Sequence, residues 1–174
     1  NTCGMTFLPF PGNTSVPPPS PIPDGDGYFG FFNKGASKEY LRNCLNGTIN
    51  AGDNYTFDFY LSRSHGATSV EVALYGVDDC NDNSFTGFSC PPSGSNLILL
   101  GTATVTTSPS SWTQQSITFT APSTINALIF GPSCTLVPDD DDYYFADDFT
   151  LTQNNGGSTT LDTVILTQSG NSCS

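Results

Sequence analysis

The sequence has very few residues that carry positive charge. Of its 174 residues, 4 are Lys or Arg and one is His, against 16 Asp and Glu, so the formal net charge is −12. Nucleic acids and anionic membranes are bound through Lys and Arg, which are missing in the required number. No apolar run approaches the length of a bilayer span. We therefore expect no nucleic-acid partner and no direct membrane insertion.

Residues that favour helices are also scarce. Only two of the acidic residues are Glu, and only two of the basic residues are Lys. Ser, Thr, Gly and Pro are abundant instead, a composition that is typical of strands and tight turns. The 13 Phe and 7 Tyr supply ample material for a core. The composition predicts an all-β domain and disfavours long disorder.

Signatures of common hydrolases are missing. The sequence has no GxSxG, HExxH or CxxC motif, and its one histidine, His65, has no evident nucleophile as a partner. Glu39 and Glu71 could form the carboxylate pair of a glycosidase, but nothing in their sequence context singles them out. We expect a protein that is not an enzyme.

The six cysteines form an even set without the spacing of a zinc site. They indicate disulfide bonds, and hence a secreted or cell-surface protein. Several pairings are possible, and the sequence does not choose among them. A bridge between Cys80 and Cys90 is favoured because it would close a polar loop between two strand-like runs. The remaining pairs would then be Cys3 with Cys173 and Cys44 with Cys134.

Alternating apolar and polar residues predict strands along most of the chain. The clearest run is 55–61, where Tyr55, Phe57, Phe59 and Leu61 would face the core. Segment 34–45 is open between a helical turn and a strand. Further strands are predicted within 70–75, 96–107, 114–119, 125–130, 143–152 and 161–167.

Eight or nine short strands separated by turns predict a disulfide-stapled β-sandwich of two sheets, a jelly roll. The predicted organisation is a Pro-rich extension over 1–22, the jelly roll over 23–152, and a Gly-rich linker with an extra strand over 153–174.

Four stretches together carry a family resemblance. They are PDGDGYFGF at 23–31, EYLRNCLNGTINAGDNYTFDFYLS at 39–62, SSWTQQSITFTAPSTINALIFG at 110–131 and YYFADDFTL at 143–151. In this order they resemble the jelly-roll carbohydrate-binding modules and galactose-binding-like domains of secreted bacterial surface proteins and glycan-degrading enzymes. The resemblance implies a two-sheet jelly roll, often with a structural calcium. It also implies sugar binding on the concave face or on the loops at one end.

Segment 143–151 places a carboxylate among aromatic residues. By alternation Asp147 shares a face with Phe145 and Phe149 and would point into the core, where an unpaired carboxylate is costly. A calcium ion would explain this position, and the resemblance implies such a calcium, for which Asp24 and Asp26 are the nearest acidic partners. The alternatives are a hydrogen-bonded carboxylate or a β-bulge that turns Asp147 outward. The run 139–142, four Asp in a row, is interpreted as a solvated loop, with a second calcium as the alternative.

Sugar binding needs exposed aromatic rings beside polar groups. Alternation places Tyr60 and Tyr75 opposite the core residues of their strands, and Arg63 and His65 follow the first of these strands. Phe85 and Tyr144 are expected on or near loops. These six residues are the predicted ligand contacts, whereas Trp112 is interpreted mainly as a packing residue because the resemblance implies that role.

Two functions are consistent with these observations. The first is a secreted, non-catalytic carbohydrate-binding module for a neutral or calcium-bridged polysaccharide. The alternative is a structural subunit of an extracellular adhesin or fibre. The run 159–167 suggests this alternative, because a strand beyond the resembling domain could associate with an edge of another copy.

Overall fold

The computed structural model describes residues 17–25, 27–35, 37–80, 90, 96–135 and 141–154. Nine strands lie within these ranges: β1 (Phe29–Lys34), β2 (Ser37–Lys38), β3 (Leu41–Ile49), β4 (Asn54–His65), β5 (Ser69–Val77), β6 (Ile98–Thr106), β7 (Thr113–Thr120), β8 (Ile125–Pro132) and β9 (Asp142–Gln153). Within the same ranges, no helix has the length and hydrophobicity needed to cross a membrane. The predicted strand at 161–167 lies outside the described residues.

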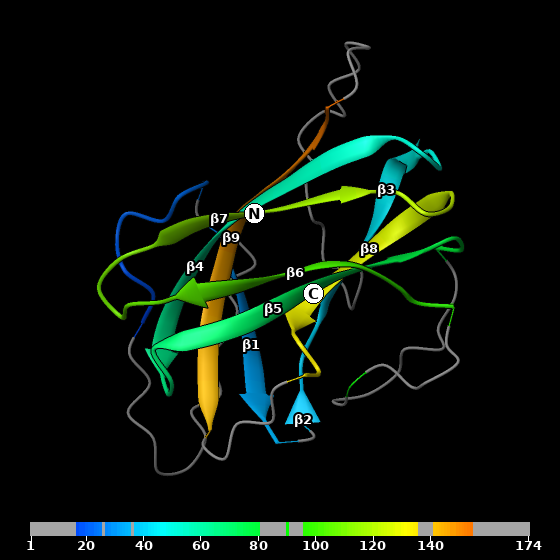
Figure 1. Cartoon of the computed structure of the whole chain (residues 1–174). Coiled ribbons are helices and arrows are strands. Elements are labelled where there is room, and N and C mark those ends of the chain that lie inside the picture. The colour runs from blue at the N-terminus through cyan, green and yellow to red at the C-terminus, as the bar shows by residue number, and fades with distance from the viewer. Residues whose placement is uncertain are drawn as a thin grey trace, which may run out of the picture.

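The strands form two antiparallel sheets that pack face to face (Figure 1). The five-stranded sheet has the order β2-β1-β9-β4-β7, and the four-stranded sheet has the order β3-β8-β5-β6. Apart from the short hairpin strand β2, the chain passes between the sheets in the order of a jelly roll. The predicted all-β jelly roll is confirmed, and segment 34–45, left open between helix and strand, contributes to β1, β2 and β3.

Aromatic rings fill the space between the sheets. The alternation predicted on β4 is confirmed, since Tyr55, Phe57, Phe59 and Leu61 are at most 1% exposed. Phe130 of β8 lies among these rings, with its centroid 4.8 Å from that of Phe59 and 5.7 Å from that of Phe57. Burying each such ring contributes roughly 1.5–3 kcal/mol. The core-facing residues of β4 are thus those that the sequence pattern identified.

A second, smaller apolar cluster covers the other face of the four-stranded sheet. It is formed by residues of β5 and β8, with two half-buried residues packed against them: Ala73, Tyr75, Val77, Ala127 and Ile129, with Tyr40 and Leu97. Tyr75 is only 9% exposed. The prediction that Tyr75 presents an exposed ring is therefore wrong. Alternation placed the ring away from the main core, but it could not show that other side chains cover that face.

The alternation of core-facing and outward-facing residues reverses partway along strand β9. Tyr144 and Ala146 face the core before the change, and Phe149 and Leu151 face it afterwards. The change occurs at Asp148, which has a φ of 50°, where the register with β4 shifts. This is the β-bulge that was the alternative for this strand, because one inserted residue reverses the alternation. The expectation that Asp147 points into the core is wrong.

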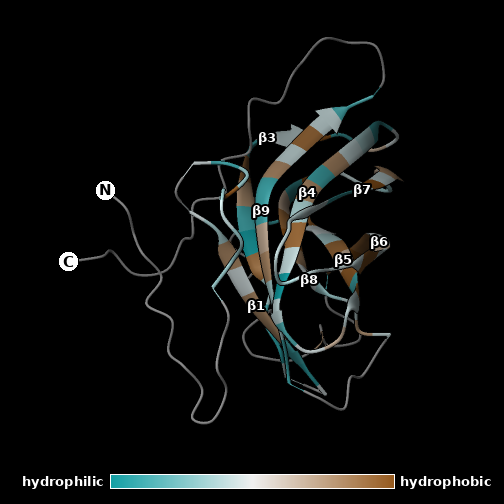
Figure 2. Ribbon diagram, turned by 90° about the vertical axis from the view of Figure 1, so that its left-hand side faces the viewer, coloured by the Kyte–Doolittle hydropathy of each residue, from teal (hydrophilic) through white to brown (hydrophobic). Residues whose placement is uncertain are grey.

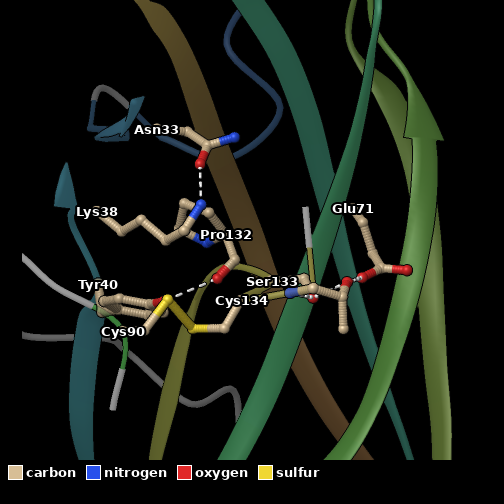
Figure 3. Close-up of a disulfide and its surroundings, with 9 residues drawn as sticks. Asn33, Lys38, Tyr40, Glu71, Cys90, Pro132, Ser133 and Cys134 are labelled. Atoms are coloured by element: carbon tan, nitrogen blue, oxygen red, sulfur yellow. Dashed lines mark hydrogen bonds between the residues drawn. A yellow bond between two sulfur atoms is a disulfide. The ribbon is translucent and has the colours of Figure 1, made fainter. Parts of the chain in front are cut away.

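Two disulfides attach the long β5–β6 connection to neighbouring strands. Cys44 of β3 is bonded to Cys80, and Cys90 is bonded to Cys134 (Figure 3), with Cα atoms 5.4 and 5.7 Å apart. The predicted pairings of Cys80 with Cys90 and of Cys44 with Cys134 are wrong. Strands β3 and β5 both pair with β8, and this long-range arrangement brings Cys44 to the end of β5. Cys3 and Cys173 lie outside the described residues.

Candidate functional site

One row of side chains crosses the outer face of the five-stranded sheet, the face turned away from the core. The row consists of Glu39, Phe32, Tyr143 and His65, and is referred to below as the aromatic row. Phe32 of β1 is the register partner of Tyr143 on β9, and Tyr143 is that of His65 on β4. Glu39 follows β2 and donates its backbone N–H to the Phe32 carbonyl at 3.0 Å. Because Phe31 faces the core, Phe32 and its partners face outward.

Tyr143 lies at the centre of the aromatic row. Its ring is nearly parallel to the His65 ring, with a 16° interplanar angle and 6.3 Å between centroids. It also meets Phe145 edge-on at 5.7 Å, and Tyr28 meets Phe145 in the same way at 5.4 Å. A Cβ atom at Gly30 would overlap the Tyr143 ring, so this ring lies directly over the Gly30 backbone. The rings of Tyr28, Phe32 and Tyr143 remain partly exposed.

The pKa values of Tyr143 and Glu39 in the row are shifted from their ordinary values. Burial raises the pKa of the Tyr143 phenol to about 12, with further contributions from the nearby Glu39 carboxylate and from Tyr28. Burial also raises the pKa of Glu39, although the Phe32 N–H, 3.0 Å from its Oε2 atom, acts in the opposite direction. The phenol is therefore a neutral hydrogen-bond donor at physiological pH. Together with Glu39 and His65 it offers polar groups beside apolar ring faces.

The segment 17–25, referred to below as the strap, passes over the outer side of this sheet (dark blue in Figure 1). The Trp112 indole donates its N–H to the Pro19 carbonyl at 2.9 Å, and the Asp24 N–H donates to Asp147 Oδ2 at 3.0 Å. Asp147, which accepts the Asp24 N–H, is 7% exposed, and Phe145 on the same strand is fully buried. Part of the predicted Pro-rich extension therefore packs on the sandwich, against Trp112 and Asp147.

A polar surface occupies the rest of the outer face of β4 and β7, with β9 beside it. Figure 2, which is turned toward this side of the molecule, shows the strands with mixed polar and apolar colouring. Thr56 and Thr118 hydroxyls are 3.2 Å apart, Thr120 bonds Asn54 at 2.5 Å, and Ser116 donates to Asp58. Neighbouring hydroxyls and amides of this kind can exchange hydrogen bonds with a hydroxylated ligand.

The structure brings some predicted ligand contacts together and separates others. Tyr60 and His65 both lie on the outer face of β4, where Tyr60 is the register partner of Asp147. Arg63, near the end of the same strand, donates from Nη1 to the Gly66 carbonyl at 2.7 Å. Tyr144 is fully buried in the core, so its expected position near a loop is wrong. Tyr75 belongs to the other sheet, and Phe85 lies outside the described residues.

Sequence reasoning missed Phe32 and Tyr143 of the aromatic row and the neighbouring Tyr28, and it considered Glu39 only as half of a glycosidase pair. The signal was present at Tyr143, because the side opposite Tyr144 and Ala146 is the outer face. It was misread since alternation was continued through the bulge at Asp148. Nothing local to Phe32 or Tyr28 indicates that they meet β9, which is more than a hundred residues away in the chain.

The described surroundings of Asp147 do not resemble a calcium shell. Two backbone N–H groups, those of Asp24 and Asp148, are directed at this carboxylate, whereas calcium requires oxygen ligands. No group of three or more His, Cys, Asp or Glu side chains converges anywhere in the described ranges. Burial is the main cause that raises the pKa of Asp147, and the nearby Asp24 and Asp148 carboxylates add to it. Asp26 lies outside the described residues, so calcium at this position stays a prediction.

The acidic run 139–142 is only partly described. Asp141 forms an ion pair with Lys34, but Asp142 belongs to β9 and is 1% exposed. The interpretation of the run as a solvated loop is therefore wrong for Asp142. Its Oδ1 atom accepts the Ala67 N–H at 2.7 Å, and its Oδ2 atom accepts the Tyr144 hydroxyl at 3.2 Å.

Glu39 and Glu71 do not face a common cleft. Glu39 lies on the outer side of the five-stranded sheet, beside Phe32. Glu71 is on β5 of the other sheet, and its neighbours Val70 and Val72 face the core, so its side chain points away from the sandwich. Hydrogen bonds from Ser133 and Thr135 lower the pKa of Glu71. The two carboxylates therefore point outward from different sheets and do not share a cleft.

No protein-family model and no curated protein matches this sequence. Carbohydrate-binding modules are among the solved structures that resemble the chain. A family 4 module has a TM-score of 0.46 and 16% identity, over 72% of this chain and 83% of the other. The N-terminal cellulose-binding domain of β-1,4-glucanase C from Cellulomonas fimi has a TM-score of 0.44 and 18% identity, over 74% and 79%. The K3 cleaved adhesin domain of Lys-gingipain from Porphyromonas gingivalis has a TM-score of 0.39 and 16% identity, over 66% and 62%.

Proposed function

We propose that this chain is an extracellular, non-catalytic carbohydrate-binding module that holds a glycan against the outer face of its five-stranded sheet. The observation that carries the proposal is the aromatic row. Partly exposed rings of Phe32 and Tyr143 stand beside Glu39 and His65 on three adjoining strands and the end of β2. Ring faces pack against the C–H faces of pyranoses, while the carboxylate, phenol and imidazole exchange hydrogen bonds with hydroxyls.

The surface charge favours a neutral polysaccharide. With a net charge of −12, the molecule repels anionic polymers at long range. An anionic glycan would need a bridging cation, and calcium, predicted from the sequence, is the natural candidate. Two disulfides among the described cysteines support an oxidising, extracellular compartment.

The carboxylates near the row support binding without catalysis. Glu39 accepts the Phe32 N–H, and Asp147 accepts the Asp24 N–H beneath the strap. Each carboxylate is thus held as a hydrogen-bond acceptor by the backbone. Glu71, the other candidate of a glycosidase pair, lies on the opposite sheet.

A binding screen with a ring-removing variant tests the proposal. The chain is applied to a panel of neutral and acidic polysaccharides by affinity electrophoresis, with calcium and with chelator. Tyr143→Ala should weaken binding at least about tenfold, which is the effect of losing about 1.4 kcal/mol. Leu99→Ala is the matched control, because Leu99 is 55% exposed but lies on β6 of the other sheet.

Binding that Leu99→Ala weakens as much as Tyr143→Ala would contradict the assignment of the site. A thermal melt of each variant ensures that it is folded. If no polysaccharide on the panel retards the migration of the folded wild-type chain, the module proposal fails.

A further inference from the structure

Directly beneath the aromatic row, on the core side of the same sheet, lies a row of three polar side chains. Lys38 of β2, Asn33 of β1 and Asp142 of β9 are register partners across three adjacent strands. Lys38 is fully buried, Asp142 is 1% exposed and Asn33 is 6% exposed. A lysine amine at such a place must be paired or lose its proton, because burying an ammonium ion is costly.

The Lys38 amine is directed at the Asn33 carboxamide (Figure 3). Its Nζ atom is 2.5 Å from Asn33 Oδ1. The two residues face each other across the β1–β2 hairpin, so the strands themselves hold the amine against the carboxamide. This is the arrangement that converts a bimolecular reaction between two groups into a positioned intramolecular one.

The environment also favours the reactive form of the amine. Burial lowers the pKa of Lys38, while the nearby Asp142 carboxylate opposes this effect. An unprotonated amine is a nucleophile, and a desolvated lysine is activated in this way in enzymes that use covalent lysine chemistry. Asp142 is the acidic group closest in register to Asn33 and is held in place by the Ala67 N–H.

We propose that Lys38 and Asn33 form an intramolecular amide bond. The Lys38 ammonium passes one proton to the Asp142 carboxylate, and the free Nζ attacks Asn33 Cγ. The new C–N bond forms as the Cγ–Nδ2 bond breaks. The proton held by Asp142 and the one displaced from Nζ go to the departing nitrogen, which leaves as ammonium, and Asp142 is again a carboxylate. No oxidant, reductant or other co-reactant is required.

The bond would replace a buried ion by a neutral amide. It would also covalently close the β1–β2 hairpin immediately before Glu39, and so hold that carboxylate beside Phe32 in the aromatic row. The bond itself does not depend on the glycan-binding proposal, because all three side chains lie on the core side of the sheet.

Intact mass of the reduced and denatured chain tests the proposal. The expected mass is about 17 Da below that of the sequence, because one ammonia has been lost. A succinimide at an Asn–Gly step gives the same mass deficit, so tryptic peptides are needed to distinguish the two products. Trypsin should fail to cleave after Lys38, and the peptide that ends at Lys34 should be joined to the peptide that ends at Arg42.

Two variants test which residues form the amide bond and which residue transfers the proton. Lys38→Arg keeps a cationic hydrogen-bond donor but cannot form the bond, and Asp142→Asn removes the acid–base group while both partners remain. Both variants should have the full mass of their sequence. Full mass in Lys38→Arg would show that the loss of ammonia in the wild-type chain requires Lys38. Full mass in the wild-type chain, a deficit of about 18 Da that indicates an amide to Asp142 instead, or a deficit retained in Lys38→Arg would each overturn the proposal.

Discussion

At the scale of single residues, Asp147 shows how one inserted residue decides the environment of a side chain. The bulge at Asp148 turns Asp147 from the core to the outer face, where the strap covers it. Burial costs the ionised carboxylate hydration, and the N–H donors of Asp24 and Asp148 offset only part of that cost. The net effect is a raised pKa. At neutral pH the fold therefore buries an ionised Asp147 carboxylate whose lost hydration is not fully replaced by hydrogen bonds.

This gives a pH-dependent prediction. A carboxyl group whose pKa is raised on folding contributes stability at low pH, and this contribution is lost as the pH rises through the folded-state pKa. Asp147→Asn should therefore gain in stability relative to the wild type between acidic and neutral pH, by about 1.4 kcal/mol for each unit of the pKa shift. Urea unfolding of both proteins over this range, in the presence of chelator, provides the measurement.

Calcium provides the contrasting outcome. If Asp147 is a calcium ligand, calcium should raise the melting temperature of the wild type and not that of Asp147→Asn, because a ligand bound only to the folded state stabilises it. A melting temperature insensitive to calcium in both proteins would remove the predicted role of this residue in metal binding.

At the scale of elements, the β4–β5 turn contacts the buried carboxylate of Asp142. Gly66 has a φ of +96°, and a Cβ atom there would overlap this carboxylate. The next residue, Ala67, donates its N–H to the same carboxylate at 2.7 Å. The turn therefore needs glycine for two independent reasons, its backbone conformation and its contact with β9.

A pair of glycine variants separates these two reasons. Gly52 has a φ of +86°, but in the described part of the chain no atom outside Gly52 and its two chain neighbours lies within 4 Å of the position that a Cβ would take there. Gly52→Ala should cost about 1–2 kcal/mol from the backbone conformation alone. Gly66→Ala should cost at least about 1 kcal/mol more, because Asp142 must move and its hydrogen bonds weaken. Chemical denaturation measures both, and equal losses would show that Asp142 does not restrict Gly66.

At the scale of the whole molecule, the two described disulfides and the candidate site lie on different sheets. Cys44 is on β3, and Cys80, Cys90 and Cys134 adjoin the four-stranded sheet through β5 and β8. The aromatic row crosses the five-stranded sheet. The crosslinks therefore attach to the four-stranded sheet and not to the strands that carry the aromatic row, although the hydroxyl of Tyr40, the residue after Glu39, lies 3.3 Å from Cys134 Sγ.

We expect stability and binding to separate accordingly. Replacing Cys44 and Cys80 together by Ser should lower the free energy of unfolding by about 2–4 kcal/mol, and Cys90 with Cys134 should behave similarly, since the bridges span comparable separations of 36 and 44 residues. At a temperature where the variants remain folded, polysaccharide binding should be unchanged. A variant that melts as the wild type does, or that loses binding while folded, would contradict this separation.

Composition and local patterns were enough to predict the class of the protein and most of its core. Scarce Glu and Lys disfavoured helices, and the alternation on β4, β5 and β7 identified Phe57, Val72 and Ile117 as buried. These inferences succeed because side-chain alternation is a local property of an extended strand and requires no knowledge of its partner.

The features that depend on which strands are neighbours emerged only from the folded chain. The bulge in β9 reversed the alternation that would place Asp147 inside, and the pairing of β3 and β5 with β8 determined the bonding of Cys44 to Cys80. The aromatic row joins Phe32 and Tyr143 to His65 across three strands. Such contacts arise from long-range pairing and packing, which local periodicity does not encode.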